Sequence, residues 1–172
     1  ATLGANNNIT VEAKMISSID AFVGSFAVAL AAGFVGVSGA GAGAFAVNTI
    51  DYAVISEVNS SGLTAGGKVA ATAEDMATID ATVSSASLAI AVGVNAYAGA
   101  VAVSTANNTV DNTIEASVNV SDVTATNMDV IAIDDTNVTV EARAAALSAS
   151  IGFGAALSGG GALAEIIATS TV

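Results

Sequence analysis

The feature that most constrains the fold is an internal repeat with a period of 60 residues. When the sequence is shifted by 60 positions, 62 residues pair without a gap and 21 of the pairs are identical. Composition alone would give roughly seven identities, so the match is a repeat. We therefore predict a single repetitive domain over residues 1–172, with an incomplete last copy. The copies cover 3–62, 63–122 and 123–172.

The third copy follows the same pattern with a shifted register. One inserted residue before "VTVEA" aligns Val140-Glu141-Ala142 with Ile79-Asp80-Ala81. This alignment predicts that Ile19, Ile79 and Val140 occupy equivalent surroundings. Because the chain starts at one phase of the repeat and stops inside another, we expect a segment of a longer array, or neighbouring molecules that complete the missing part.

Three charge-free stretches could each be read as a membrane-spanning helix or as strands. They are 21–50, 81–110 and 144–164, and each has the length a transmembrane helix needs. Within them, large and small residues alternate: Leu88, Ile90 and Val92 share one parity, opposed by Ala89 and Ala91. Period two indicates strands, and each interior glycine would cost a helix about 1 kcal/mol. We expect the large face to form the packed interior, and the small face to meet a closely approaching layer or form a thin exterior.

An all-β fold follows, and a β-solenoid (parallel β-helix) built from repeats of about 60 residues is the favoured form. Three coils of about 20 residues in each repeat would give eight or nine coils and a length of roughly 40 Å. Turn chemistry is expected at "GANNN", "NSSG" and "GLTAGGK". The alternative is a stacked β-sandwich with long hairpins, in which the segment 39–43 bends the chain.

Composition excludes several classes of function. The chain has no Cys and no His, so it lacks the residues of Ser-His, Cys-His and zinc-hydrolase sites. Its net charge of −12, with 15 acidic and 3 basic residues, disfavours nucleic acid and anionic lipid as partners. We predict that the protein is not an enzyme.

Several segments resemble the repeats of large bacterial filamentous adhesins of the leukotoxin and filamentous-haemagglutinin type. The segments are "FAVN" (Phe45–Asn48), "LTAGGKVAATA" (Leu63–Ala73), "DVTATNMDVIAI" (Asp122–Ile133) and "NITVEA" (Asn8–Ala13). The resemblance implies a β-helix shaft, secretion and a role at the cell surface, and it implies no catalytic residues. An archaeal surface fibre would show much the same pattern.

Acidic and asparagine residues supply the candidate sites. Glu74-Asp75 and Asp134-Asp135 fall at equivalent phases and are weak candidates for calcium ligands, although adjacent strand residues point to opposite faces. Asp20, Asp80 and Glu141 recur at one phase, about 14 Å apart over three coils, and are expected to form a surface charge column that resists sideways association. Sequons for N-glycosylation occur at Asn8, Asn59, Asn107, Asn119 and Asn137.

The function predicted from these features is structural. We expect a segment of an extracellular filament or a giant cell-surface adhesin, acting as a stiff shaft that associates with itself. The alternative is an adhesive module in which loops at the repeat junctions bind glycans of a host or cell surface. No cofactor is expected apart from the weak calcium candidate, and neither a nucleic-acid partner nor a membrane span is expected.

Overall fold

The computed structural model describes residues 2–60 and 62–171, and its regular elements in this part of the chain are all β-strands. This confirms the all-β prediction. The strands are β1 (Thr2–Ala5), β2 (Ile9–Ser60), β3 (Gly62–Ala65), β4 (Lys68–Val120), β5 (Val123–Thr124), β6 (Asn127–Gly152) and β7 (Ala156–Thr171).

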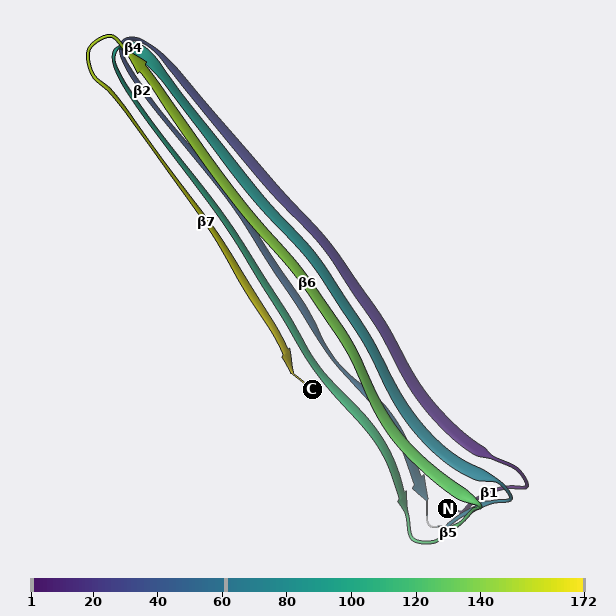
Figure 1. Ribbon diagram of the computed structural model, residues 1–172. Coiled ribbons are helices and arrows are strands. Elements are labelled where there is room, and N and C mark those ends of the chain that lie inside the picture. Colours follow the sequence, from purple (N-terminus) through teal and green to yellow (C-terminus); the bar gives the residue numbers. More distant parts are fainter. Residues whose placement is uncertain (1, 61, 172) are drawn as a thin grey trace.

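Each copy of the repeat follows one long path out and back (Figure 1). The chain leaves the end where β1 and β5 lie, which we call the base, and reverses at the opposite end, the tip. The outgoing arms are 9–33, 69–93 and 127–152, and the return arms are 35–60, 95–120 and 156–171. At a rise of 3.3 Å per residue, a complete arm is roughly 80 Å long.

Copies pair with one another in parallel and in register. Ile9 pairs with Val69, and the offset of 60 is kept as far as Ser60 and Val120. The short strands β1, β3 and β5 pair in the same order at the base. Parallel pairing in this register places equivalent residues of successive copies side by side, so each position of the repeat becomes a column across the sheet.

The register of the third copy differs from the one predicted. Outgoing arm β6 pairs with β4 at an offset of 59, so that Ile79 lies beside Val138 and not Val140. Return arm β7 pairs with β4 at an offset of 60. The base turn of the third copy is thus one residue shorter and its tip turn one residue longer. A shift of two residues keeps every side chain on its own face, and so the alternation could not reveal the error in the outgoing arm.

The number of coils in each repeat was also predicted wrongly. Paired residues lie about 60 positions apart, not 20, so each repeat adds one layer to the stack. Three layers at a strand spacing of about 4.8 Å rise only about 10 Å from first to last. The long dimension of the molecule lies along the arms (Figure 1).

The alternative with antiparallel hairpins does not match this topology. The strand pairs recorded for the described residues are parallel and join different copies. Segment 39–43, expected as a bend, is extended within β2 and continues its pairing with β4. The reversal instead falls at the tip, next to Gly33, where Phe34 is skipped in the pairing.

The core near the tip consists of small side chains. Ala89 and Ala91 of the outgoing arm pack against Ala96, Ala98 and Ala100 of the return arm. The large residues of the same stretches point outward. Their exposed fractions reach 73% at Leu30, 70% at Phe26 and 61% at Ile151. The prediction that the large face forms the interior is therefore wrong in this half, and the small face is the one that meets a closely approaching layer.

The core near the base has the opposite character. Ile79 of the outgoing arm packs against Ile50 and Val110 of the return arms, and Val69 packs against Val58 in a second cluster. Here aliphatic side chains point inward and the charged residues lie mostly on the outer faces. The molecule thus has a base half with a conventional aliphatic core and a tip half with an alanine core.

Two glycines at the base are required by the close approach of the preceding copy. A Cβ at Gly66 would lie 2.2 Å from the carbonyl oxygen of Asn6, and one at Gly67 would lie 2.2 Å from Oδ1 of Asn8. A larger residue at position 66 would push the backbones of the two copies apart, and one at position 67 would displace the side chain of Asn8. These bends confirm the turns predicted at "GANNN" and "GLTAGGK". The turn predicted at "NSSG" includes position 61, which lies outside the described residues.

We predict that the alanine core of the tip half does not accept larger side chains. Ala91→Leu places a leucine at a fully buried position and should lower the free energy of unfolding by about 1–3 kcal/mol through overpacking. Ala86→Leu, on the outward face of the same arm, should change it by less than about 0.5 kcal/mol. Urea unfolding of the two variants checks this, and equal losses would contradict the assignment of the two faces.

Candidate functional site

The most elaborate polar cluster lies inside the base half, around Asp75. This aspartate comes from the outgoing arm of the second copy and is fully buried. Its Oδ1 accepts a hydrogen bond from the hydroxyl of Tyr52, and its Oδ2 accepts one from Nδ2 of Asn112 at 2.5 Å. The hydroxyl of Ser17 lies 3.0 Å from that of Tyr52.

Strand alternation and the repeat register bring these residues together. Tyr52 and Asn112 are partners one repeat apart on neighbouring return arms, while Asp75 stands in the facing column of the outgoing arms. The two donors therefore come from different copies. The carboxylate of Asp75 thus links the first copy to the second, and the outgoing arms to the return arms.

The cluster also changes the acidity of the phenol. Burial, and the hydrogen bond to Asp75, raise the pKa of Tyr52 above its ordinary value of 10.0. The carboxylate of Asp75 has no solvent exposure, so its hydrogen bonds hold the arms together in the interior.

The four candidate calcium ligands do not converge. Glu74 is on the outer face with its Oε2 2.9 Å from Nζ of Lys14, and Asp75 is in the core. Asp134 pairs with Asp75 and accepts a hydrogen bond from the Thr136 hydroxyl, and Asp135 pairs with Met76 on the outer face. The predicted equivalence of the two acidic pairs is therefore wrong by one residue, because the base turn of the third copy is shorter. The described residues hold no group of three or more His, Cys, Asp or Glu that could bind a metal ion.

Asp20 and Asp80 form the column of surface charge that the repeat predicts, with different dimensions. They are direct partners, so they are one strand spacing of about 4.8 Å apart and not about 14 Å. Glu141, expected in the same column, pairs with Thr82 instead. The two aspartates line a shallow hollow with Phe22, at the boundary between the charged and the apolar parts of the outer face.

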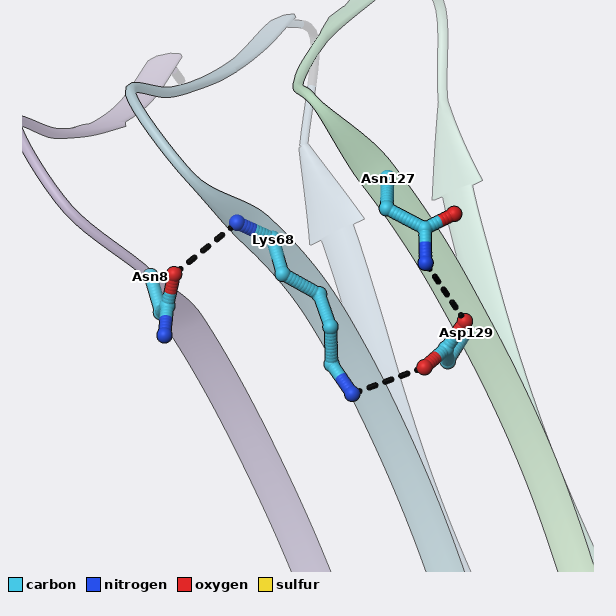
Figure 2. Close-up of polar contacts among 4 residues, drawn as sticks. All are labelled: Asn8, Lys68, Asn127 and Asp129. Atoms are coloured by element: carbon cyan, nitrogen blue, oxygen red, sulfur yellow. Dashed lines mark hydrogen bonds and ion pairs between the residues drawn. The ribbon is translucent and has the colours of Figure 1, made fainter.

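Polar contacts between copies gather at the base, where each outgoing arm starts (Figure 2). The backbone N–H of Lys68 donates to Oδ1 of Asn8 at 2.9 Å, and Nζ of Lys68 lies 2.7 Å from Oδ2 of Asp129. Asn127 donates from Nδ2 to Oδ1 of the same aspartate at 3.2 Å. Lys68 thereby connects the second copy to both of its neighbours.

Sequence reasoning missed these contacts, although a signal for them was present. Lys14 and Glu74 stand one repeat apart with opposite charges, which in a parallel stack makes them neighbours. Lys68 and Asp129 are separated by 61 residues, close to the same interval. Opposite charges at the repeat interval are thus the sign of a cross-copy ion pair.

The sequons lie mostly on outward positions. Asn59 and Asn119 are partners on neighbouring return arms, and both are exposed near the base. Asn8 and Asn137 are also exposed, whereas Asn107 is half-buried. Four of the five asparagines therefore lie on accessible surface.

Comparisons with protein-family models, with curated proteins and with solved structures found no match. Within residues 2–60 and 62–171 there is no helix long and apolar enough to cross a membrane. The evidence for function accordingly comes from the geometry of the chain.

We predict that Tyr52→Phe destabilises the protein by about 1.5–3 kcal/mol, because the buried carboxylate of Asp75 loses one of its two donors. Tyr97→Phe is the matched control: Tyr97 is 40% exposed on an outer face, and its change should stay below about 0.5 kcal/mol. Urea unfolding measures both, and equal effects would show that the Asp75 cluster does not contribute.

We predict that the stability of the fold falls at alkaline pH through Tyr52. Its pKa is higher in the folded chain than the ordinary 10.0 of the unfolded chain, so its contribution is complete below pH 10.0 and disappears as the pH rises through the folded value. Unfolding midpoints measured from about pH 8 to about pH 11.5 should decline more steeply for the wild type than for Tyr52→Phe. Parallel declines would contradict this assignment.

Proposed function

We propose that the chain is a β-solenoid segment that serves as a stiff structural part of an extracellular filament or a giant cell-surface adhesin. The regular stacking of equivalent residues supports this proposal, since every copy repeats the strand path of the one before it. Cross-copy ion pairs and the hydrogen bond from Tyr52 to Asp75 join successive layers. A stack of this kind resists bending because neighbouring layers share continuous hydrogen-bond ladders.

The observation that carries the proposal is the pair of open sheet edges. In the described chain, β2 pairs with β4 on one side, and β6 and β7 pair with β4 on the other. The outer edges of the first and third copies can accept a further parallel strand, either from a continuing chain or from another molecule. Growth would run perpendicular to the arms, at about 4.8 Å for each added copy, and would produce a ribbon about as wide as the arms are long, roughly 80 Å.

The second candidate function is an adhesive module at the repeat junctions. A hollow beside β1 lies at such a junction, at the base, and its lining includes Leu3, Val11, Glu57 and Asn59. Apolar and polar groups side by side are the kind of lining that small ligands such as sugars require. Glycan binding at this hollow would leave the ribbon free to act as the supporting stalk.

We predict that an inward charge on the third copy stops edge-to-edge growth. Val138→Lys places a lysine on the core side of the exposed edge, whereas Thr139→Lys adds the same charge on the outer side of the neighbouring position. Inward charges on edge strands block pairing. The wild type and Thr139→Lys should form fibres with a 4.8 Å meridional reflection at high concentration, and Val138→Lys should not.

Circular dichroism is the control for folding, since both variants must keep the strand signal of the wild type. Fibres formed equally well by Val138→Lys would contradict growth through this edge. A wild type that never assembles and shows no strand spacing would remove the support for the filament.

A further inference from the structure

We propose that two molecules of this chain associate face to face through the outer surfaces of their outgoing arms near the tip. The arms of the two molecules run in opposite directions. The contact uses sheet faces and not sheet edges, so it goes beyond the edge-to-edge growth proposed above and does not depend on it. The surface involved comprises the outward residues of 22–34, 82–94 and 145–153, which we call the tip face.

The centre of the tip face is an array of apolar columns. One column consists of Val28, Leu88 and Leu147, and the next begins with Leu30 and Ile90. Phe22, Phe26 and Phe34 extend the array in the first copy, with exposed fractions of 77%, 70% and 75%. The segments that form the face contain no charged residue.

The fold itself does not require these large side chains. The interior beneath them is closed by alanine pairs from the two arms, so the outward leucine, isoleucine and phenylalanine residues contribute little to the core. Leaving them in water forgoes about 25 cal/mol for each Å² of apolar surface. An outer face built from large apolar residues over an alanine core is a surface arranged for another layer.

The size of the tip face matches what a specific dimer needs. Two strands of about 13 residues and one of about nine, at about 4.8 Å spacing and 3.3 Å per residue, give roughly 550 Å² for one face. Two such faces bury about 1,100 Å² together, which exceeds the roughly 1,000 Å² expected of a specific protein interface. Sheets that pack in this way lie about 10 Å apart.

The distribution of charge selects the orientation. Each molecule has a net charge of −12, so two molecules repel each other unless their charged base halves stay apart. If the arms ran in the same direction, the Asp20 and Asp80 column of one molecule would lie over the same column of the other molecule. With arms in opposite directions, the tip faces overlap and the Asp20 and Asp80 columns of the two molecules lie far apart. Glu141 and Arg143 of the third copy reach the margin of the contact, where they form an ion pair with each other.

The opposite orientation also fixes which residues meet. A two-fold axis along the stacking direction places each layer on the same layer of its partner. The midpoint of the tip face is Val28 in the first copy and Leu88 in the second, so Leu88 faces Leu88 of the other molecule. Thr72, near the base of the same arm, would lie about 100 Å from its counterpart, at 3.3 Å per residue over both overhangs.

A second molecule of this chain fits the tip face better than a lipid bilayer does. The outer edges of the first and third copies carry backbone groups that would have no hydrogen-bond partners in hydrocarbon. Packing of two faces leaves those edges in water or in contact with further copies. The acidic charge of the molecule also opposes contact with anionic membranes.

The first test compares two substitutions on one strand. Leu30 and Ile16 both point outward from the outgoing arm of the first copy, with exposed fractions of 73% and 66%, but only Leu30 lies in the tip face. Both are changed to glutamate in the Val138→Lys background, which suppresses edge growth. Sedimentation velocity should show a dimer for the parent and for Ile16→Glu, and at least a tenfold weaker dimer for Leu30→Glu.

The second test uses single cysteines, because the chain has none of its own. In the same background, a bifunctional thiol-reactive cross-linker with a spacer of about 10 Å should join Leu88→Cys into a dimer, because the facing sheets lie about 10 Å apart, whereas Thr72→Cys should stay monomeric. Cross-linking of both would overturn the opposite orientation. A parent protein that is monomeric at every concentration, or equal effects of Leu30→Glu and Ile16→Glu, would overturn the dimer. Monomers that bind zwitterionic phosphatidylcholine vesicles, and lose this binding with Leu30→Glu, would assign the face to lipid instead.

Discussion

In-register parallel pairing between residues one repeat apart is the constraint on which the rest of the structure depends. This pairing makes each position of the repeat a column, so every side chain lies beside the side chain at the equivalent position of the next copy. A column of like charges is unfavourable. Lys14 stands beside Glu74 in its own column, and Lys68 pairs with Asp129 from a column two positions along the strand. The buried carboxylate of Asp75 is tolerated in the interior because the facing column supplies two donors, Tyr52 and Asn112.

The same alternation serves two different purposes along one arm. Near the base, inward aliphatic residues such as Ile79 form the core and outward acids keep the surface soluble. Near the tip, alanine fills the interior, as at Ala91, and the large apolar residues lie outside. The two arms can approach closely at the tip because their facing side chains are small. In the dimer that we propose, stability and association depend on different ends of a single strand.

Much of the fold could be predicted from the sequence, since the repeat period and the alternation are both local patterns. Strand type and the pairing of Ile19 with Ile79 followed directly from them. The number of coils in each repeat could not be predicted, because the sequence does not distinguish a glycine-rich turn from a glycine-rich strand. The glycines at 39–43 resemble a bend but remain extended. Which face lies inside depends on whether the opposing arm offers alanine or aliphatic partners. Ile79, for example, packs against Ile50 and Val110, and neither is its neighbour in sequence. The Asp75 cluster was missed for the same reason, although the alternation correctly separated Asp75 from Glu74.

The unequal turns of the third copy have a consequence for how such a sequence can change in length. One residue fewer at the base and one more at the tip leave the strand ladders intact, because turns absorb the difference without moving the arms. A residue gained or lost within an arm would exchange inside for outside along everything that follows it. Viable insertions and deletions are therefore confined to the two ends of each layer. The longer tip turn around Phe153, which is 97% exposed, is accordingly a natural place to graft a foreign peptide and display it along the edge of the ribbon.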